Sequence, residues 1–115
     1  MSNESAGKPR GLAAAQVAQV ADLITYQAGA VVSREILKRS AGSVTLFAFD
    51  EGEGLSEHTT PFDALVQMLE GEAEITIAGQ PYRVKGGELI LMPANQPHAL
   101  KALTRYKMLL TMLRA

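Results

Sequence analysis

The sequence has no cysteine, no tryptophan and only two histidines among its 115 residues. Without cysteine the chain cannot form disulfides, thiol nucleophiles or zinc–thiolate sites, and it suits a reducing compartment, so a cytoplasmic location is expected. The net charge of -1 and the lack of a basic stripe argue against nucleic acid as a partner. No apolar run reaches the roughly 18 residues of a membrane-spanning helix, so no membrane partner is expected.

The length suits one domain with a single hydrophobic core. The first residues are small and polar, and Lys8 and Arg10 precede the stretch GLAAAQVAQVA, which has the outline of a secretory signal. Because Gln16 and Gln19 interrupt that stretch, a short helix or a loosely held arm is the favoured interpretation. We predict a partly flexible N-terminal arm over residues 1–22 and one barrel domain over residues 23–115.

Short runs of β-branched and apolar residues follow one another from residue 30 to the end of the chain. They include SVTLFAFD, AEITI and ELILM, and glycine, proline or asparagine stands at the corners between them. No run with helical periodicity and useful length occurs after residue 25. Nine or ten strands at roughly 8–12-residue spacing are typical of an all-β sandwich or barrel.

Two of the expected strands, ELILM and YKMLLTML, are apolar at successive positions. Strands that are buried on both faces have this pattern. In an antiparallel barrel the second face then needs cover from another sheet or from another subunit. An uncovered C-terminal strand of this kind would invite aggregation. We therefore predict a homodimer.

The two histidines lie in stretches whose spacing resembles the two sequence motifs of the cupin family. Five residues separate a glycine from the first histidine, and five separate a second glycine from a proline that precedes the other histidine. The matching positions are Gly52, His58, Gly71, Gly87, Pro93 and His98. The resemblance covers residues 26–113. It implies an RmlC-like jelly-roll barrel (a double-stranded β-helix), commonly dimeric, with the motif residues facing the interior.

The chain departs from the family pattern at the positions that carry chemistry. A metal-binding cupin offers three histidines and a carboxylate to one ion, but here Thr60 replaces the second histidine and Ala64 replaces the glutamate. His58 and His98 are then an incomplete ligand set, which implies at most a weakly bound Zn, Fe, Mn or Ni ion. Thr60 would orient a water on such an ion.

Strand alternation predicts which side chains face the barrel interior. If His58 faces inward, Thr60 does too, and Ala64, Val66 and Met68 follow after the corner. Asp63 then faces outward, unless a β-bulge at the corner shifts the alternation by one residue. Ala64 would leave space where the family glutamate reaches. The predicted ligand pocket is therefore lined by His58, Thr60, Ala64, Val66, Met68 and His98.

These features favour a small-molecule-binding cupin whose specific activity is unknown and whose metal site is degenerate. One histidine would serve as a general acid or base in a modest metal-independent reaction. A metal-dependent oxygenase or isomerase acting on a small polar or sugar-like substrate is the first alternative, and it requires a third protein ligand near the histidines. A non-enzymatic sensory or accessory module is the second, since one fold hosts many functions. Whether the chain is an enzyme stays open.

Overall fold

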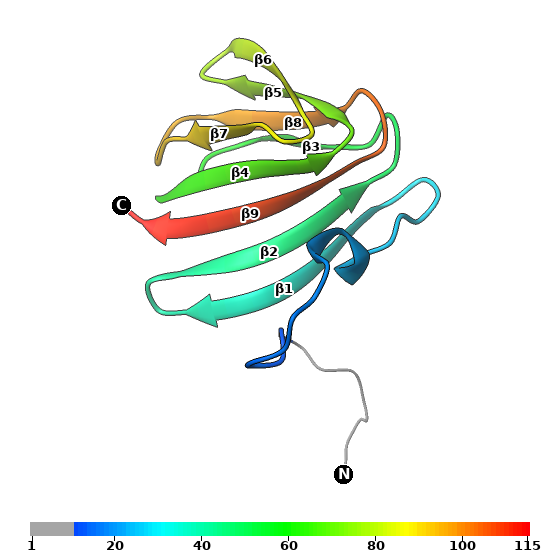
Figure 1. Ribbon diagram of the computed structural model, residues 1–115. Helices are drawn as coiled ribbons and strands as arrows, with labels where there is room; N and C mark the ends of the chain where they lie inside the picture. The colour runs from blue at the N-terminus through cyan, green and yellow to red at the C-terminus, as the bar shows by residue number, and fades with distance from the viewer. Residues whose placement is uncertain (1–10) are drawn as a thin grey trace.

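The computed structural model describes residues 11–115, which form two facing antiparallel β-sheets and one short 3₁₀ turn, η1 (Val20–Leu23) (Figure 1). The five-stranded sheet has the order β1 (Val31–Arg39), β2 (Gly42–Phe49), β9 (Tyr106–Arg114), β4 (Phe62–Glu70) and β7 (Leu89–Met92). The four-stranded sheet has the order β3 (Gly54–His58), β8 (His98–Ala102), β5 (Glu72–Ile77) and β6 (Gln80–Lys85). This arrangement confirms the predicted all-β jelly roll.

The corner between β4 and β5 depends on Gly71. Its φ of 82° lies in the left-handed region, which glycine adopts without steric penalty. A Cβ at this position would overlap the carbonyl oxygen of Arg105 and approach the Cα atom of Tyr106 to 2.7 Å. The chain can therefore reverse here against the start of β9 only because no side chain is present.

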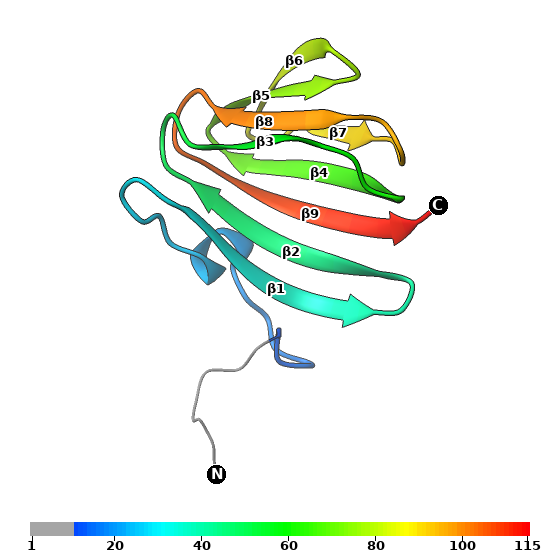
Figure 2. The same ribbon diagram turned by 180° about the vertical axis from the view of Figure 1, so that it is seen from behind.

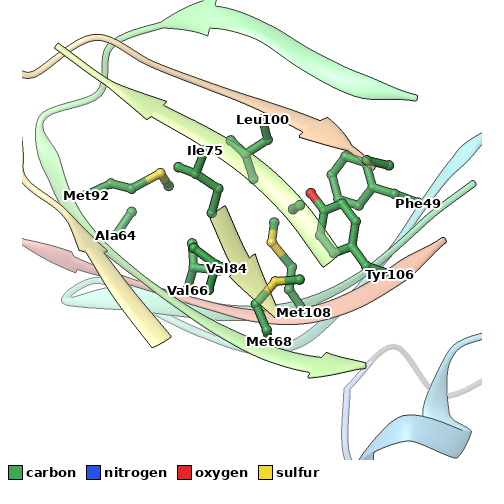
Figure 3. Packing of buried hydrophobic residues seen from close by; sticks show 12 residues of the cluster. Phe49, Ala64, Val66, Met68, Ile75, Val84, Met92, Leu100, Tyr106 and Met108 are labelled. Carbon is green, nitrogen blue, oxygen red and sulfur yellow. The ribbon is translucent and has the colours of Figure 1, made fainter. Parts of the chain in front are cut away.

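The main core lies between the two sheets, and β4 shows how the sequence builds it. Ala64, Val66 and Met68 are buried, whereas Leu65 and Gln67 between them are exposed, as strand alternation predicts. Figure 3 shows these inner side chains packed against Ile75 and Leu100 of the opposite sheet. Burying one such side chain contributes about 1.5–3 kcal/mol, so this layer dominates the stability of the fold.

A second, smaller cluster lies on the outer face of the five-stranded sheet, the face turned away from the other sheet. Ile24 packs there against Leu46 and Ala48 of β2. Further hydrogen bonds hold this N-terminal segment, from the Leu12 amide to the Ile36 carbonyl (3.1 Å) and from the Lys107 amine to the Ala21 carbonyl (2.6 Å). The chain itself therefore covers part of the second apolar face that the sequence analysis left to another sheet or subunit. Residues 1–10 of the predicted arm lie outside the described residues.

The rest of this outer face carries exposed apolar residues. Leu37, Val44, Thr111, Leu65 and Leu91 are successive cross-strand partners from β1 to β7, and we call this line the leucine row. Leu37 and Leu91 are 47% and 52% exposed. Leu89 and Leu113 extend the exposed area on either side of the row. Within residues 11–115, no helix is long and apolar enough to cross a membrane.

Candidate functional site: a histidine pair at one end of the barrel

Strand register brings the two histidines together although 40 positions separate them in the sequence. His58 at the end of β3 is the direct cross-strand partner of His98 at the start of β8. Their Nε2 atoms are 3.2 Å apart, and the rings meet edge to face with centroids separated by 4.4 Å. The two imidazoles therefore form one chemical unit.

Backbone carbonyls hold the opposite nitrogen of each ring. Nδ1 of His58 lies 2.8 Å from the Ser56 carbonyl oxygen, and Nδ1 of His98 lies 3.3 Å from that of Gln96. A carbonyl oxygen only accepts, so these contacts place a proton on Nδ1 of both rings. In two neutral rings the Nε2 lone pairs then point at each other. A hydrogen bond across the 3.2 Å between the two Nε2 atoms then needs one added proton, so the pair is a site that can take up a single proton.

The two rings differ in exposure. His98 is only 4% exposed, whereas His58 is exposed at the end of its strand. Burial lowers the pKa of His98, the neighbouring His58 lowers it further, and the Gln96 carbonyl acts in the opposite direction. His98 is thus neutral near neutral pH, and His58 is the ring that a ligand in solution can reach.

The polar neighbours that could complete a ligand set are engaged elsewhere. The Thr60 hydroxyl donates to the Phe62 carbonyl (3.2 Å) and accepts from the Phe62 amide (3.3 Å), so it closes its own turn. The Asp63 carboxylate accepts from the Ala94 amide (2.9 Å) and ties β4 to the loop before β8. Between residues 11 and 115, no group of three histidine, aspartate or glutamate side chains could hold a metal ion.

The two Nε2 atoms of the histidine pair are the donors available to a metal ion at this site. Two imidazole nitrogens on one tetrahedral zinc, with bonds of about 2.05 Å, would be about 3.3 Å apart, close to the spacing of the histidine pair. A catalytic zinc site nevertheless has three protein ligands and a structural site four. With two imidazoles and no third ligand in the described chain, the residues present do not fit a resident metal ion.

The three apolar residues of the predicted pocket lie within the packed core. Ala64, Val66 and Met68 are at most 2% exposed. Met92, the cross-strand partner of Ala64, extends its thioether over it (Figure 3). The space that the sequence analysis expected beside Ala64 is therefore partly filled by a methionine from β7, which makes this wall of the barrel apolar.

Sequence analysis did not single out Tyr106, the first residue of β9. Its ring is fully buried and stacks on Phe49 at a centroid distance of 4.4 Å. Its hydroxyl has no hydrogen-bond partner among residues 11–115, and burial raises its pKa. Figure 3 shows this oxygen directed into the barrel interior. Strand alternation could have identified Tyr106 as an inward-facing residue, because it lies on the same face of β9 as the buried Met108.

Residues 45–113 match the family model described as a cupin domain. The chain belongs to the cupin family. No protein with a curated description matches this cupin.

Solved structures show the same fold over nearly the whole chain. A conserved protein of unknown function from Streptococcus pyogenes is 35% identical with a TM-score of 0.87, and the alignment covers 91% of this cupin and 92% of that chain. A cupin superfamily protein from Desulfitobacterium hafniense DCB-2 is 28% identical with a TM-score of 0.86, covering 95% and 100%. A Cupin 2 conserved barrel domain protein from Leptotrichia buccalis is 38% identical with a TM-score of 0.80, and this cupin spans 46% of its length.

Proposed function

We propose that this cupin is a small-molecule-binding protein whose His58–His98 pair recognises an anionic or hydroxylated group of its ligand. The observation that carries the proposal is the 3.2 Å approach of the two Nε2 atoms, with both Nδ1 atoms directed at carbonyl oxygens. When the pair holds one added proton, its positive charge attracts an anionic group of a ligand bound against the exposed His58 ring. When it holds none, its lone pairs accept from a hydroxyl group.

The same pair has the properties of a general acid–base group. An imidazole titrates near neutral pH, and the neutral, buried His98 is a proton acceptor beside an exposed partner. A ligand bound against His58 would be close enough to exchange a proton with the histidine pair. A modest metal-independent proton transfer is therefore the reaction that the pair supports best if the protein turns over a substrate.

A metal-dependent oxygenase or isomerase is the second candidate. The spacing of the Nε2 atoms favours it, because it is close to the distance between neighbouring ligands on one ion. The engagement of Thr60 and Asp63 with backbone groups disfavours it. Metal content separates the two candidates, because an ion held by only two imidazoles is lost readily.

The test is the metal content of the untagged protein before and after dialysis against a mild chelator. We expect little bound metal, and complete loss of any that is present on dialysis. Small hydroxy acids and sugars are then screened by thermal shift. The variant His58→Gln should not be stabilised by any compound that stabilises the unmodified protein. Near-stoichiometric metal that survives dialysis would overturn the proposal in favour of the metal-dependent enzyme.

We also propose that the functional unit is a homodimer joined through the leucine row. The covered half of the outer face already shows that β2 and β9 bury apolar side chains on both faces. Among residues 11–115, the rest of this face presents five leucines that are each more than one third exposed, which is a larger cluster than scattered surface leucines on a monomer. A second copy offers the same apolar surface, so the pairing is self-complementary.

A further inference from the structure

A cavity of about 320 Å³ lies at the hairpin between β1 and β2, away from the histidine pair. The hairpin, the start of β4 and the end of β9 form its walls. Lys38, Arg39 and Arg114 supply charge, Ser43 supplies a hydroxyl group, and Phe62 and Met112 supply apolar surface. We call it the hairpin cavity. Its volume lies at the lower end of the range of small-molecule sites.

Strand register explains why this cavity carries charged and hydroxyl groups although it continues the core layer. Met92, Ala64, Met112, Ser43 and Lys38 are successive cross-strand partners from β7 to β1. The first two of these residues are buried, and Lys38 at the other end is exposed. Figure 2 shows β1 at the margin of the five-stranded sheet, far from β5 and β6 of the opposite sheet. Along this row the inner face therefore changes from methionine and alanine side chains to the Ser43 hydroxyl and the Lys38 ammonium group. The change occurs where the four-stranded sheet no longer covers the five-stranded sheet.

The charges around the cavity are unbalanced. It has three cationic side chains and one carboxylate, that of Glu35, whereas the whole chain has a net charge of -1. The salt bridges of the described residues join Arg83 to Glu72 and Arg105 to Asp50, so none neutralises a cation of the hairpin cavity. The cavity is a local positive region on a protein with nearly neutral net charge, and such a region attracts anions.

Backbone carbonyls orient both guanidinium groups. Arg114 donates from Nε to the Ser40 carbonyl (2.7 Å), and Arg39 donates from one terminal nitrogen to the Lys38 carbonyl (2.8 Å). These bonds occupy one N–H of each group and leave its charge in place, so the remaining N–H groups can bind a carboxylate.

The apolar wall adds a second requirement for the ligand. Phe62 is a cross-strand partner of Arg114, whose guanidinium carbon lies 5.9 Å from the centre of its ring. Met112 lies beside it on the inner face. We propose that the hairpin cavity binds a small organic carboxylate with a compact apolar or aromatic body. This inference is independent of the proposed role of the histidine pair.

The test uses benzoate as the probe and the full-length protein labelled with ¹⁵N in low-salt buffer. We expect NMR shifts that saturate and that centre on the Phe62, Met112 and Lys38 amides, with the His58 and His98 amides unmoved. The variant Lys38→Gln with Arg114→Gln should bind benzoate about tenfold more weakly, because it loses two exposed charge contacts. Circular dichroism verifies that this variant folds.

The matched control is Lys85→Gln with Lys101→Gln, which changes the net charge equally at exposed positions of the other sheet. It should retain the affinity of the unmodified protein. Equal weakening in the control, an absence of saturable shifts, or shifts centred on His58 and His98 would overturn the proposal. Inorganic phosphate is the second probe. If it binds as tightly as benzoate, the apolar wall contributes nothing and the proposed ligand class is wrong.

Discussion

At the residue scale, the histidine pair shows how burial gives two identical side chains different properties. His98 lies in the layer between the sheets, whereas its partner His58 reaches solvent. Desolvation disfavours the charged form of a buried imidazole, so the neutral form of His98 is preferred.

The pKa of His98 predicts a pH dependence of stability. Because its folded pKa lies below the ordinary value of 6.5, the unfolded chain takes up this proton first as the pH falls. The free energy of unfolding should therefore decrease as the pH drops below about 6.5 and stop decreasing below the folded pKa. Urea unfolding at pH 7.5, 6.5 and 5.5 measures this. In His98→Gln the decrease over this window should be smaller, and an unchanged slope would contradict the assignment.

Tyr106→Phe removes a hydroxyl group that is buried without a hydrogen-bond partner in the described residues. Leaving such a group unpaired costs about 1–3 kcal/mol, so the variant should be as stable as the unmodified protein or more stable. Thermal and urea unfolding provide the measurement. Destabilisation by more than about 1 kcal/mol would mean that the hydroxyl has a partner, such as a buried water molecule.

At the element scale, the corners between the strands determine where the strands pair. Gly71 lets β4 turn into β5 directly against the start of β9. Gly79 in the turn between β5 and β6 has the same φ of 82° but open space around it. The two glycines therefore separate the effect of backbone conformation from the effect of steric contact.

Gly79→Ala should destabilise the protein by about 1–2 kcal/mol, the cost of a left-handed conformation for a residue with a Cβ. Gly71→Ala should be clearly more damaging, because its Cβ also overlaps the Arg105 carbonyl and crowds Tyr106. Urea unfolding of both variants compares them directly. Equal destabilisation would show that the β4–β5 corner moves to accept a side chain.

At the scale of the whole molecule, the outer face of the five-stranded sheet is partly buried and partly exposed. Ile24 and its neighbours cover the end near Leu46, and among residues 11–115 the leucines of the leucine row at the other end are exposed. An extended, exposed apolar sheet face favours association. The proposed dimer interface therefore lies on the exposed part of this face.

Leu91→Asp with Leu113→Asp should convert the protein to a monomer near 12.3 kDa, whereas the unmodified chain should have about twice that mass in light scattering at micromolar concentration. Both leucines are more than half exposed, so the folded monomer should tolerate the change. Tyr82→Asp, at an exposed position of the opposite sheet, is the control and should leave the dimer intact. A monomeric unmodified protein would contradict the proposal.

The fold could be read from the sequence because its signals are local. Strand alternation, glycines at corners and the spacing of the two motifs each involve neighbouring residues. The inward facing of Ala64, Val66 and Met68 followed from alternation alone, and their burial agrees with it. The meeting of His58 with His98 followed from the fold that those motifs imply, and the register of β3 with β8 places the two side by side.

What each polar group bonds to was settled only by tertiary structure. The Thr60 hydroxyl closes a turn with Phe62, and the Asp63 carboxylate caps the distant Ala94 amide. Met92 fills the space above Ala64, and the hairpin cavity forms where β1 extends past the opposite sheet. These outcomes depend on which strands lie side by side. A local pattern specifies which way a side chain points, whereas its hydrogen-bond partner and the space around it belong to residues that only the folded chain brings near.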